Sequence, residues 1–191
     1  MIEIRIHGRG GQGSVVAAYV LATTAIDVGR FAQAFPAFGA ERRGAPVASF
    51  VRIAATPIRR HCQVVQPAFL IIQDETLLEL PETLAGLLPG GGIVANTQRD
   101  SQALSDTLGH PVHALPATRL SRDTLGRPMP NTALLAAFLT LTNLLPVAGL
   151  KDALAQRFKG DVLARNLDLI DQVAAATPAG LWQERAHATS A

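Results

Sequence analysis

The segment Gly8-Arg9-Gly10-Gly11-Gln12-Gly13 constrains the fold more than any other part of this sequence. It follows an alternating apolar run at residues 2–6 and precedes an almost wholly apolar stretch. A chain that leaves a strand and turns at once into a helix needs glycines, because such a turn requires positive φ angles. We expect Gly10 to be the residue with the unusual φ. The pattern predicts a strand, a glycine loop and a helix in direct succession.

A glycine loop before a helix is typical of an anion-binding site. The first N–H groups of a helix have no partner within it, and the helix dipole places positive charge there. Because glycines have no side chains, a ligand can reach the backbone, and residues 8–13 are therefore candidates to bind a phosphate group. The alternative is a glycine turn that serves only the close packing of helix on strand.

The loop also fits the spacing G-x-G-x-x-G of dinucleotide-binding proteins. That function requires an acidic residue about 20 positions further on, at the end of the next strand. Asp27 comes too early, Glu41 lies beyond Pro36 in a loop, and the candidate strand 31–35 contains no carboxylate. The sequence therefore disfavours an NAD site.

Length and composition predict one α/β domain. The chain has 191 residues, of which 48% are hydrophobic and 17% charged, and such a chain can bury one sizeable core. We expect residues 1–185 to form a single domain and residues 186–191 a loose tail. A surface this poor in charge indicates burial against other subunits, or else a thick three-layer core.

Charge and cysteine content exclude several classes of function. The net charge of +2 shows no nucleic-acid footprint,. Cys62 is the single cysteine, so this chain cannot hold an internal disulfide, an iron–sulfur cluster or a cysteine-rich zinc site by itself,. Without a long unbroken apolar run or a signal peptide, we expect no membrane span and a cytoplasmic location.

Hydrophobic periodicity predicts the order of the elements. The expected strands are residues 2–7, 31–35, 47–53, 68–72, 93–96 and 112–115. The expected helices are residues 11–28, 75–88, 134–139, 150–158 and 162–176. Gln73, Asp74 and Glu75 follow a continuously apolar strand, at the edge where α/β sheets bind ligands.

These elements predict a three-layer α/β/α sandwich with a mostly parallel or mixed sheet. The C-terminal helices are expected to form a helical extension of it.

The loop between Pro36 and Pro46 contains Glu41, Arg42 and Arg43, flanked by Gly39 and Gly44. Arginine is suited to two-point binding of a phosphate or carboxylate. The pair could bind an anionic ligand or a carboxylate of a neighbouring subunit, and the residues alone do not decide between the two.

Other polar residues have ordinary explanations. His110 and His113 lack a cysteine or carboxylate that would complete a metal site. Ser14 is explained as a residue at a helix start, and Asn131 as an N-cap, with a ligand or subunit contact as the alternative for Asn131. With no nucleophile elbow, no paired cysteine and histidine and no paired carboxylates, we predict no catalytic residue and no metal site. The residues indicate a binding module rather than a complete enzyme.

Two segments together resemble a known family. Residues 4–13 and 35–47, which include the glycine loop and the Phe-Pro-x-x-Gly-x-Glu-Arg-Arg-Gly stretch, are similar to the gamma subunit of the 2-oxoacid:acceptor oxidoreductases. Weaker similarity continues through residues 70–77, 90–97 and the helix at Asn131, and so spans most of the chain. Related indolepyruvate oxidoreductase beta subunits typically lack the second stretch, which favours the gamma type.

The resemblance implies a multi-subunit complex that oxidises a 2-oxoacid. In this family the 2-oxoacid is decarboxylated on thiamine diphosphate with Mg, electrons pass through [4Fe-4S] clusters to ferredoxin or NAD, and coenzyme A takes the acyl group. The implied partners are alpha and beta subunits, which bind thiamine diphosphate, and a ferredoxin-like [4Fe-4S] subunit or domain. This chain alone is expected to bind none of those cofactors.

The resemblance also suggests a role for the two motifs. Gamma domains have been associated with accommodation of coenzyme A, which fits an anion-binding glycine loop and arginines, while subunit docking fits the same residues. The candidate binding residues are Gly8, Arg9, Gly10, Gly11, Gln12, Gly13, Glu41, Arg42, Arg43 and Gly44. The alternative is a freestanding nucleotide-binding α/β protein.

Overall fold

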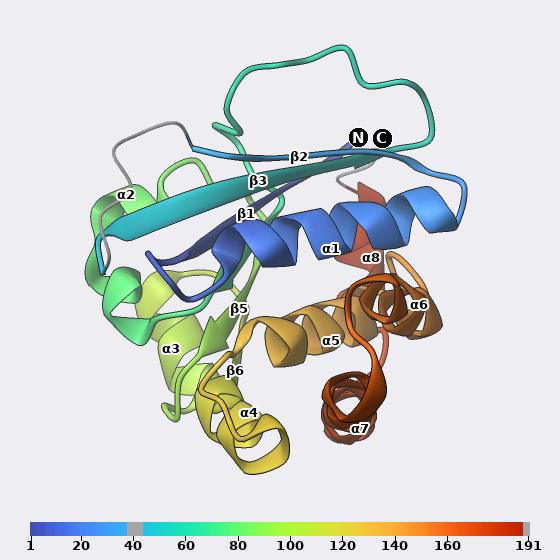
Figure 1. The fold of residues 1–191 in the computed structure, drawn as a ribbon. Coiled ribbons are helices and arrows are strands. Elements are labelled where there is room, and N and C mark those ends of the chain that lie inside the picture. Colours follow the sequence, from blue (N-terminus) through green and yellow to red (C-terminus); the bar gives the residue numbers. More distant parts are fainter. Residues whose placement is uncertain (38–43, 189–191) are drawn as a thin grey trace.

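The fold is built on one six-stranded sheet of mixed direction (Figure 1). A computed structural model describes residues 1–37 and 44–188. The strands lie side by side in the order β2-β3-β1-β4-β5-β6. Their bounds are β1 Ile2–Arg9, β2 Phe31–Pro36, β3 Pro46–Ala54, β4 Phe69–Ile72, β5 Gly92–Asn96 and β6 Val112–Leu115.

Helices cover both faces of this sheet, as expected for a three-layer sandwich. Their bounds are α1 Ser14–Asp27, the 3-10 helix η1 Glu75–Glu79, α2 Pro81–Leu84, α3 Ser101–Leu108, α4 Ala117–Leu125, α5 Asn131–Thr142, α6 Val147–Arg157, α7 Gly160–Ala176 and α8 Gln183–Ala188. Helices α1 and α5 pack on one face, with α4, α6, α7 and α8 outside them. The opposite face of the parallel strands is covered by η1, α2 and α3.

The parallel half of the sheet comes from continuous apolar runs. Strands β4 and β5 run parallel to β1, and all four residues of β4 are buried. Phe69 and Ile71 point into the larger core with α1 and α5, while Leu70 and Ile72 point into a smaller core with η1. A strand buried on both faces has no polar side, which explains the unbroken apolar sequence.

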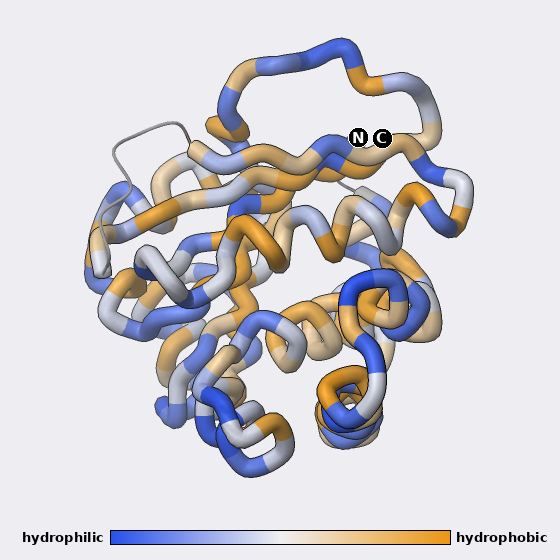
Figure 2. The backbone as a smooth tube through the Cα atoms, viewed as in Figure 1, coloured by the Kyte–Doolittle hydropathy of each residue, from blue (hydrophilic) through white to orange (hydrophobic). Residues whose placement is uncertain are grey.

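Helix α5 belongs to the core itself rather than to the periphery. Eleven of its twelve residues are buried, and it contacts β4, β5, α1 and α7. A helix that is apolar all round must be enclosed on every side. In Figure 2, α5 is mainly hydrophobic, whereas hydrophilic segments lie on outer helices such as α4 and α7. The C-terminal helices thus complete one layer of the sandwich.

The other half of the sheet is antiparallel. Strand β3 pairs with β1 from Arg9↔Pro46 to Ile2↔Ile53 and with β2 on its other side. The isoleucines of β1 face α1, and the alternate residues Glu3, Arg5 and His7 face the opposite side,. The mixed sheet that the sequence predicted is therefore confirmed.

Buried charges occupy the face of this antiparallel half that α1 does not cover. Arg52 has no exposed surface. Its guanidinium donates to Glu3 Oε1 at 2.7 Å and to the carbonyl of Cys62 at 2.5 Å. Arg5 donates to the carbonyls of Thr83 and Ala85 at 2.8 and 2.7 Å. Loop carbonyls and one carboxylate therefore satisfy charges that a strand would ordinarily expose to water.

Two helix expectations need correction. The segment 75–88 is not one helix, because Pro81 starts a separate short helix and Gly86, with φ 76°, turns the chain after it,. Helix α1 starts at Ser14 rather than near Gly11, because positive φ angles extend through Gly13. At the C-terminus, α8 extends to Ala188 over the first residues of the expected tail.

Candidate functional site

The carboxyl ends of β1 and β4 form the candidate site. The chain leaves β1 into α1 on one face of the sheet and leaves β4 into η1 and α2 on the other face. Such a reversal opens a crevice at the strand ends, where open α/β sheets bind ligands. The glycine loop and the polar segment after β4 both lie at this point.

The glycine loop is a tight turn. The amide of Gln12 donates to the carbonyl of Arg9 at 3.0 Å, and the third residue of the turn, Gly11, has φ 98°. This is the pattern of a type II turn, in which only the third residue needs a positive φ. The expectation that Gly10 has the unusual φ is therefore wrong. Gly13, with φ 81°, is the second such residue and is the N-cap of α1.

Gly8 lies in β1 and is required by close packing. A Cβ built there would overlap Ser14 Oγ and would lie 2.7 Å from Gln73 Oε1. The hydroxyl of Ser14 donates to that same oxygen at 2.9 Å. Ser14 is the first residue of α1, as predicted, and its side chain joins the helix to the end of β4.

Asp74, directly after β4, binds two residues of the glycine loop. Its Oδ2 accepts from Gln12 Nε2 at 3.0 Å and lies 3.3 Å from Arg9 Nε. Burial alone raises the pKa of Asp74, but hydrogen bonds from Thr76 and Gln12 and the charge of Arg9 outweigh it, so the pKa lies below its ordinary value,. The charge of Arg9 is thus largely neutralised within the protein.

The second sequence motif meets the first. Gly10 donates to the carbonyl of Ala45 at 2.9 Å and accepts from the amide of Gly44 at 3.2 Å. Arg9 Nη1 also donates to the carbonyl of Gly44 at 3.1 Å. Of the predicted site residues, Gly8 to Gly13 and Gly44 therefore lie together, whereas Glu41, Arg42 and Arg43 lie outside the described residues.

One buried donor in the crevice has no partner in the described structure. Gln73 has no exposed surface, and its Nε2 has no hydrogen-bond acceptor among the described residues. A buried amide without an acceptor costs about 1–3 kcal/mol. Because Gln73 lines the crevice below the start of α1, a ligand oxygen bound there could accept from it.

The crevice encloses about 430 Å³ between the glycine loop and α4. Asn96 holds its base, because its Nδ2 donates to the Gln73 carbonyl at 2.8 Å and its Oδ1 accepts from the amide of Thr118 at 3.0 Å. Arg119 and Arg122 line the wall from α4. Sequence reasoning missed these two arginines, because nothing near them in the chain indicated that α4 would face the glycine loop.

The geometry gives no support for an NAD site. Strand β3 lies between β1 and β2, so the end of β2 is not beside the glycine loop. Asp27 lies at the far end of α1, where it accepts from Gln156 at 2.7 Å. Neither position suits a ribose whose pyrophosphate binds at the loop.

The remaining sequence candidates lie elsewhere. The N-cap of α5 is Pro130, so the N-cap role expected for Asn131 is wrong: its Oδ1 accepts from the next amide, that of Thr132, at 3.0 Å. His113 lies on β6, where burial lowers its pKa. Across residues 1–37 and 44–188, no group of three His, Cys, Asp or Glu side chains is placed to share a metal ion. None of the described helices has the length and apolar character needed to cross a bilayer.

Comparison with known proteins gives one consistent result. The sequence profile of the family described as pyruvate ferredoxin/flavodoxin oxidoreductase matches residues 3–176. The pyruvate synthase subunit PorC of Methanocaldococcus jannaschii is 45% identical over 166 residues, which cover 87% of this chain and 91% of that protein.

Two further relatives agree. The common subunit gamma of the pyruvate/ketoisovalerate oxidoreductases of Pyrococcus abyssi is 41% identical over 169 residues, covering 87% of this chain and 91% of that one. The crystal structure of pyruvate oxidoreductase subunit PORC from Thermotoga maritima superimposes with a TM-score of 0.80 at 31% identity, covering 91% and 95% of the two chains.

Proposed function

The chain belongs to the pyruvate ferredoxin/flavodoxin oxidoreductase family as a gamma-type subunit, and we propose that it acts in a multi-subunit complex that oxidises a 2-oxoacid. In this proposal the complex converts a 2-oxoacid and coenzyme A to acyl-coenzyme A and CO₂, and passes two electrons to ferredoxin or NAD. Thiamine diphosphate, Mg and [4Fe-4S] clusters reside on alpha, beta and ferredoxin-like partner subunits.

The composition of this chain supports that division of labour. Its single cysteine, Cys62, is exposed and lies far in sequence from the glycine loop. Four thiolates are the usual ligands of a [4Fe-4S] cluster, so the clusters of this proposal require another subunit. A freestanding nucleotide-binding protein is not favoured, because the curated relatives are named as subunits.

We propose that the glycine-loop crevice accommodates a phosphate of coenzyme A. The unpartnered Nε2 of Gln73, buried below the start of α1, is the observation that carries this assignment. Arg119 and Arg122 supply positive charge from α4. From the second motif, Arg42 and Arg43, with Glu41 beside them in the sequence, remain candidate coenzyme A residues. Arg9 and Gln12 shape the loop rather than neutralise the ligand, because Asp74 already binds them.

Exposed apolar residues supply a surface for the partner subunits. On α1, Tyr19 and Ile26 are 45% and 55% exposed, and Phe31 at the start of β2 is 45% exposed. Strand β2 is also an edge of the sheet and contains no charged residue. Uncharged edges with apolar neighbours favour association.

Coexpression with candidate alpha, beta and ferredoxin-like subunits tests the subunit role. We expect the tagged chain to copurify with thiamine- and cluster-containing subunits and to lack visible cluster absorption when purified alone. Recovery of the tagged chain without those subunits would contradict the subunit role.

Kinetics of the assembled complex test the coenzyme A site. A charge-assisted contact contributes about 1.5–3 kcal/mol, so Arg122→Gln and Arg43→Ala should each raise the Michaelis constant for coenzyme A about tenfold or more if the contact is direct. Reduction of the clusters by 2-oxoacid alone should remain. Arg30→Gln, at an exposed position outside the crevice, is the matched control. Unchanged coenzyme A kinetics in an assembled complex would contradict direct binding.

A further inference from the structure

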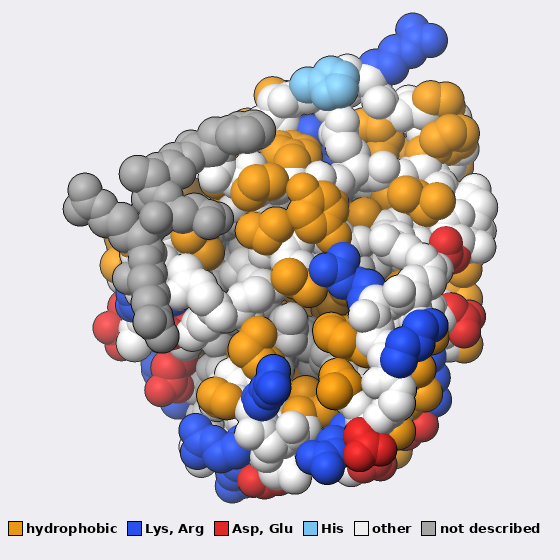
Figure 3. All heavy atoms as spheres, viewed as in Figure 1, with side chains coloured by type: hydrophobic (Ala, Val, Ile, Leu, Met, Phe, Trp, Pro, Cys, Tyr) orange, Lys and Arg blue, Asp and Glu red, His pale blue; other side chains and the backbone are white. Residues whose placement is uncertain are grey.

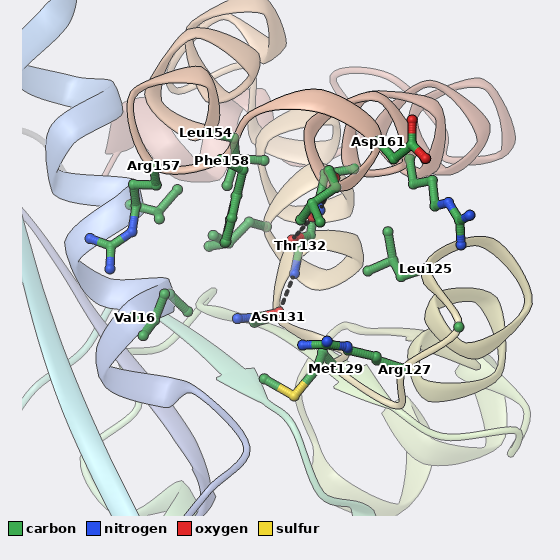
Figure 4. A pocket seen from close by; sticks show the side chains of 17 residues that line it. Val16, Leu125, Arg127, Met129, Asn131, Thr132, Leu154, Arg157, Phe158 and Asp161 are labelled. Atoms are coloured by element: carbon green, nitrogen blue, oxygen red, sulfur yellow. Dashed lines mark hydrogen bonds between the residues drawn. The ribbon is translucent and has the colours of Figure 1, made fainter.

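A second cavity lies on the other side of the glycine loop (Figure 4). It encloses about 700 Å³ between α1, α5, α6 and α7 and the segment that joins α4 to α5. Asn131 and Met129 line it beside the glycine loop: a Cβ built at Gly13 would lie 3.0 Å from Asn131 Nδ2 and 3.3 Å from Met129 Cε. No described residue lines both this cavity and the crevice. The cavity is therefore a distinct site.

The walls of this cavity are apolar and its base is fixed. Val16 of α1, Leu135 of α5 and Phe158, the C-cap of α6, line it. At the base, Thr132 Oγ1 donates to Asn166 Oδ1 at 2.9 Å, and Asn166 Nδ2 donates to the Val162 carbonyl at 2.7 Å. Because these buried polar atoms satisfy one another, they hold α5 and α7 in place and leave the apolar walls to contact a ligand.

The charged side chains of the lining are mostly positive. Arg127, Arg157 and Arg165 line the cavity, with Asp161 as the acidic lining residue, so the formal charge of the lining is three minus one, or +2. Within the described part of the chain, none of the three arginines is in an ion pair. Figure 3 shows Lys and Arg side chains among hydrophobic ones on this face.

The arginines, not the helix ends, set the sign of the potential. Helices α1, α5 and α7 begin at the cavity while α4 and α6 end there, so their dipoles largely oppose one another,. In Figure 4, Arg127 extends across the cavity toward Asn131. The side-chain amide of Asn131 has a free Nδ2 among the described residues, since only its Oδ1 is bonded. Both side chains therefore offer hydrogen-bond donors to the cavity.

We propose that this cavity binds an organic anion with an apolar body. Its carboxylate or phosphate meets Arg127 and Asn131, and its body packs against Val16, Leu135 and Phe158. Small-molecule sites enclose about 300–1,000 Å³ and combine apolar walls with a few convergent polar groups, which is the arrangement found here. The closed base and volume favour a small molecule over a peptide segment.

Calorimetric titration of the full chain tests this assignment with three probes of eight carbons each: octanoate, octyl phosphate and octylamine. We expect octanoate or octyl phosphate to bind at least about tenfold more tightly than octylamine, because the arginines repel an ammonium group. The relative affinity of the two anions distinguishes a carboxylate ligand from a phosphate ligand. Acetate and inorganic phosphate should bind weakly, since they lack the apolar body.

Matched variants locate the binding. Val16→Trp fills the cavity and should abolish binding, while Val15→Trp on the same helix does not line it and should leave binding unchanged. Arg127→Gln should weaken anion binding about tenfold, whereas Arg30→Gln should have no effect. Equal binding of octanoate and octylamine, or binding unaffected by Val16→Trp in a folded chain, would overturn the proposal.

Two further outcomes would also overturn it. Displacement of octanoate by coenzyme A would assign the cavity to the coenzyme A site of the proposed function. Loss of subunit assembly in Val16→Trp, without anion binding in the wild type, would show that the cavity holds a segment of a partner protein. The second result does not depend on whether the glycine-loop crevice binds coenzyme A.

Discussion

The two halves of the sheet bury their strands by different means. In the parallel half, both faces of β4 are apolar, and the strand packs between two hydrophobic cores. In the antiparallel half, one face of β1 is apolar and the other carries Glu3, Arg5 and His7, of which Glu3 pairs with Arg52 of β3. Apolar packing degrades gradually on mutation, whereas a buried charge network fails when one member is lost. The glycine loop extends from the charged half.

The largest expected effect is at the centre of that network. Arg52→Ala should lower the free energy of unfolding by about 3–5 kcal/mol, because the Glu3 carboxylate and the Cys62 carbonyl lose a buried donor,. Denaturant unfolding measures the loss. The matched control is Arg60→Ala, whose side chain is 58% exposed and 3.9 Å from Glu3, and which should cost less than about 1 kcal/mol. Equal costs would remove the distinction between the two halves.

The charged half should also make stability depend on pH. Burial, with a smaller contribution from Arg5, lowers the pKa of His7 from 6.5 to about 4. Between these values the unfolded chain binds a proton that the folded chain does not, so stability falls as pH falls through this window. At 1.36 kcal/mol per pH unit, His7 accounts for a loss of up to about 3 kcal/mol by pH 4. His7→Gln should flatten this part of the pH–stability curve, and an unchanged curve would contradict the assignment.

A smaller effect is expected where the two halves meet. Gly8→Ala places a methyl group against Ser14 Oγ and Gln73 Oε1, and overpacking of this kind costs about 1–3 kcal/mol. Removing the hydroxyl in the double variant Gly8→Ala/Ser14→Ala should recover part of the loss. If thermal unfolding shows no recovery, the clash is not the reason for glycine at this position.

The smallest effect is expected in the parallel half. Ile71→Val removes one buried methyl group from β4 and should cost about 0.5–1.5 kcal/mol,. This loss of unfolding free energy should be the same at pH 7 and pH 5, because removing the methyl group removes only apolar contacts. A strongly pH-dependent cost would show that the two halves are coupled.

Local sequence pattern was enough for the parallel half and for the glycine loop. The unbroken apolar run at residues 68–72 predicted β4 closely, since a strand that is buried on both faces has apolar residues at every position,. The glycines predicted a strand, a turn and a helix, whereas the contact between the loop and Gly44 is a finding of the structure alone. The prediction that Gly10 has the unusual φ was wrong. Which residue has a positive φ depends on the type of turn, and in a type II turn it is the third residue, here Gly11,.

Features that depend on distant segments could not be predicted. Arg5 on β1 is satisfied by the carbonyls of residues 83 and 85, and Arg52 on β3 by those of residues 60 and 62, all of which lie on later segments of the chain. Likewise, Arg119 and Arg122 join the crevice only because the sheet order brings α4 to the end of β5. Spacing along the chain carries no signal for either arrangement.

The most direct test of the central claim is Gly10→Ala in the assembled complex. Gly10 occupies the second position of the turn, which accepts an ordinary φ,, so alanine should fold without strain and leave thermal stability unchanged or slightly higher. We predict normal assembly, normal reduction of the clusters by 2-oxoacid, and a Michaelis constant for coenzyme A raised about tenfold, equivalent to about 1.4 kcal/mol. An assembled complex with unchanged coenzyme A kinetics would contradict the account and leave the loop as a packing device.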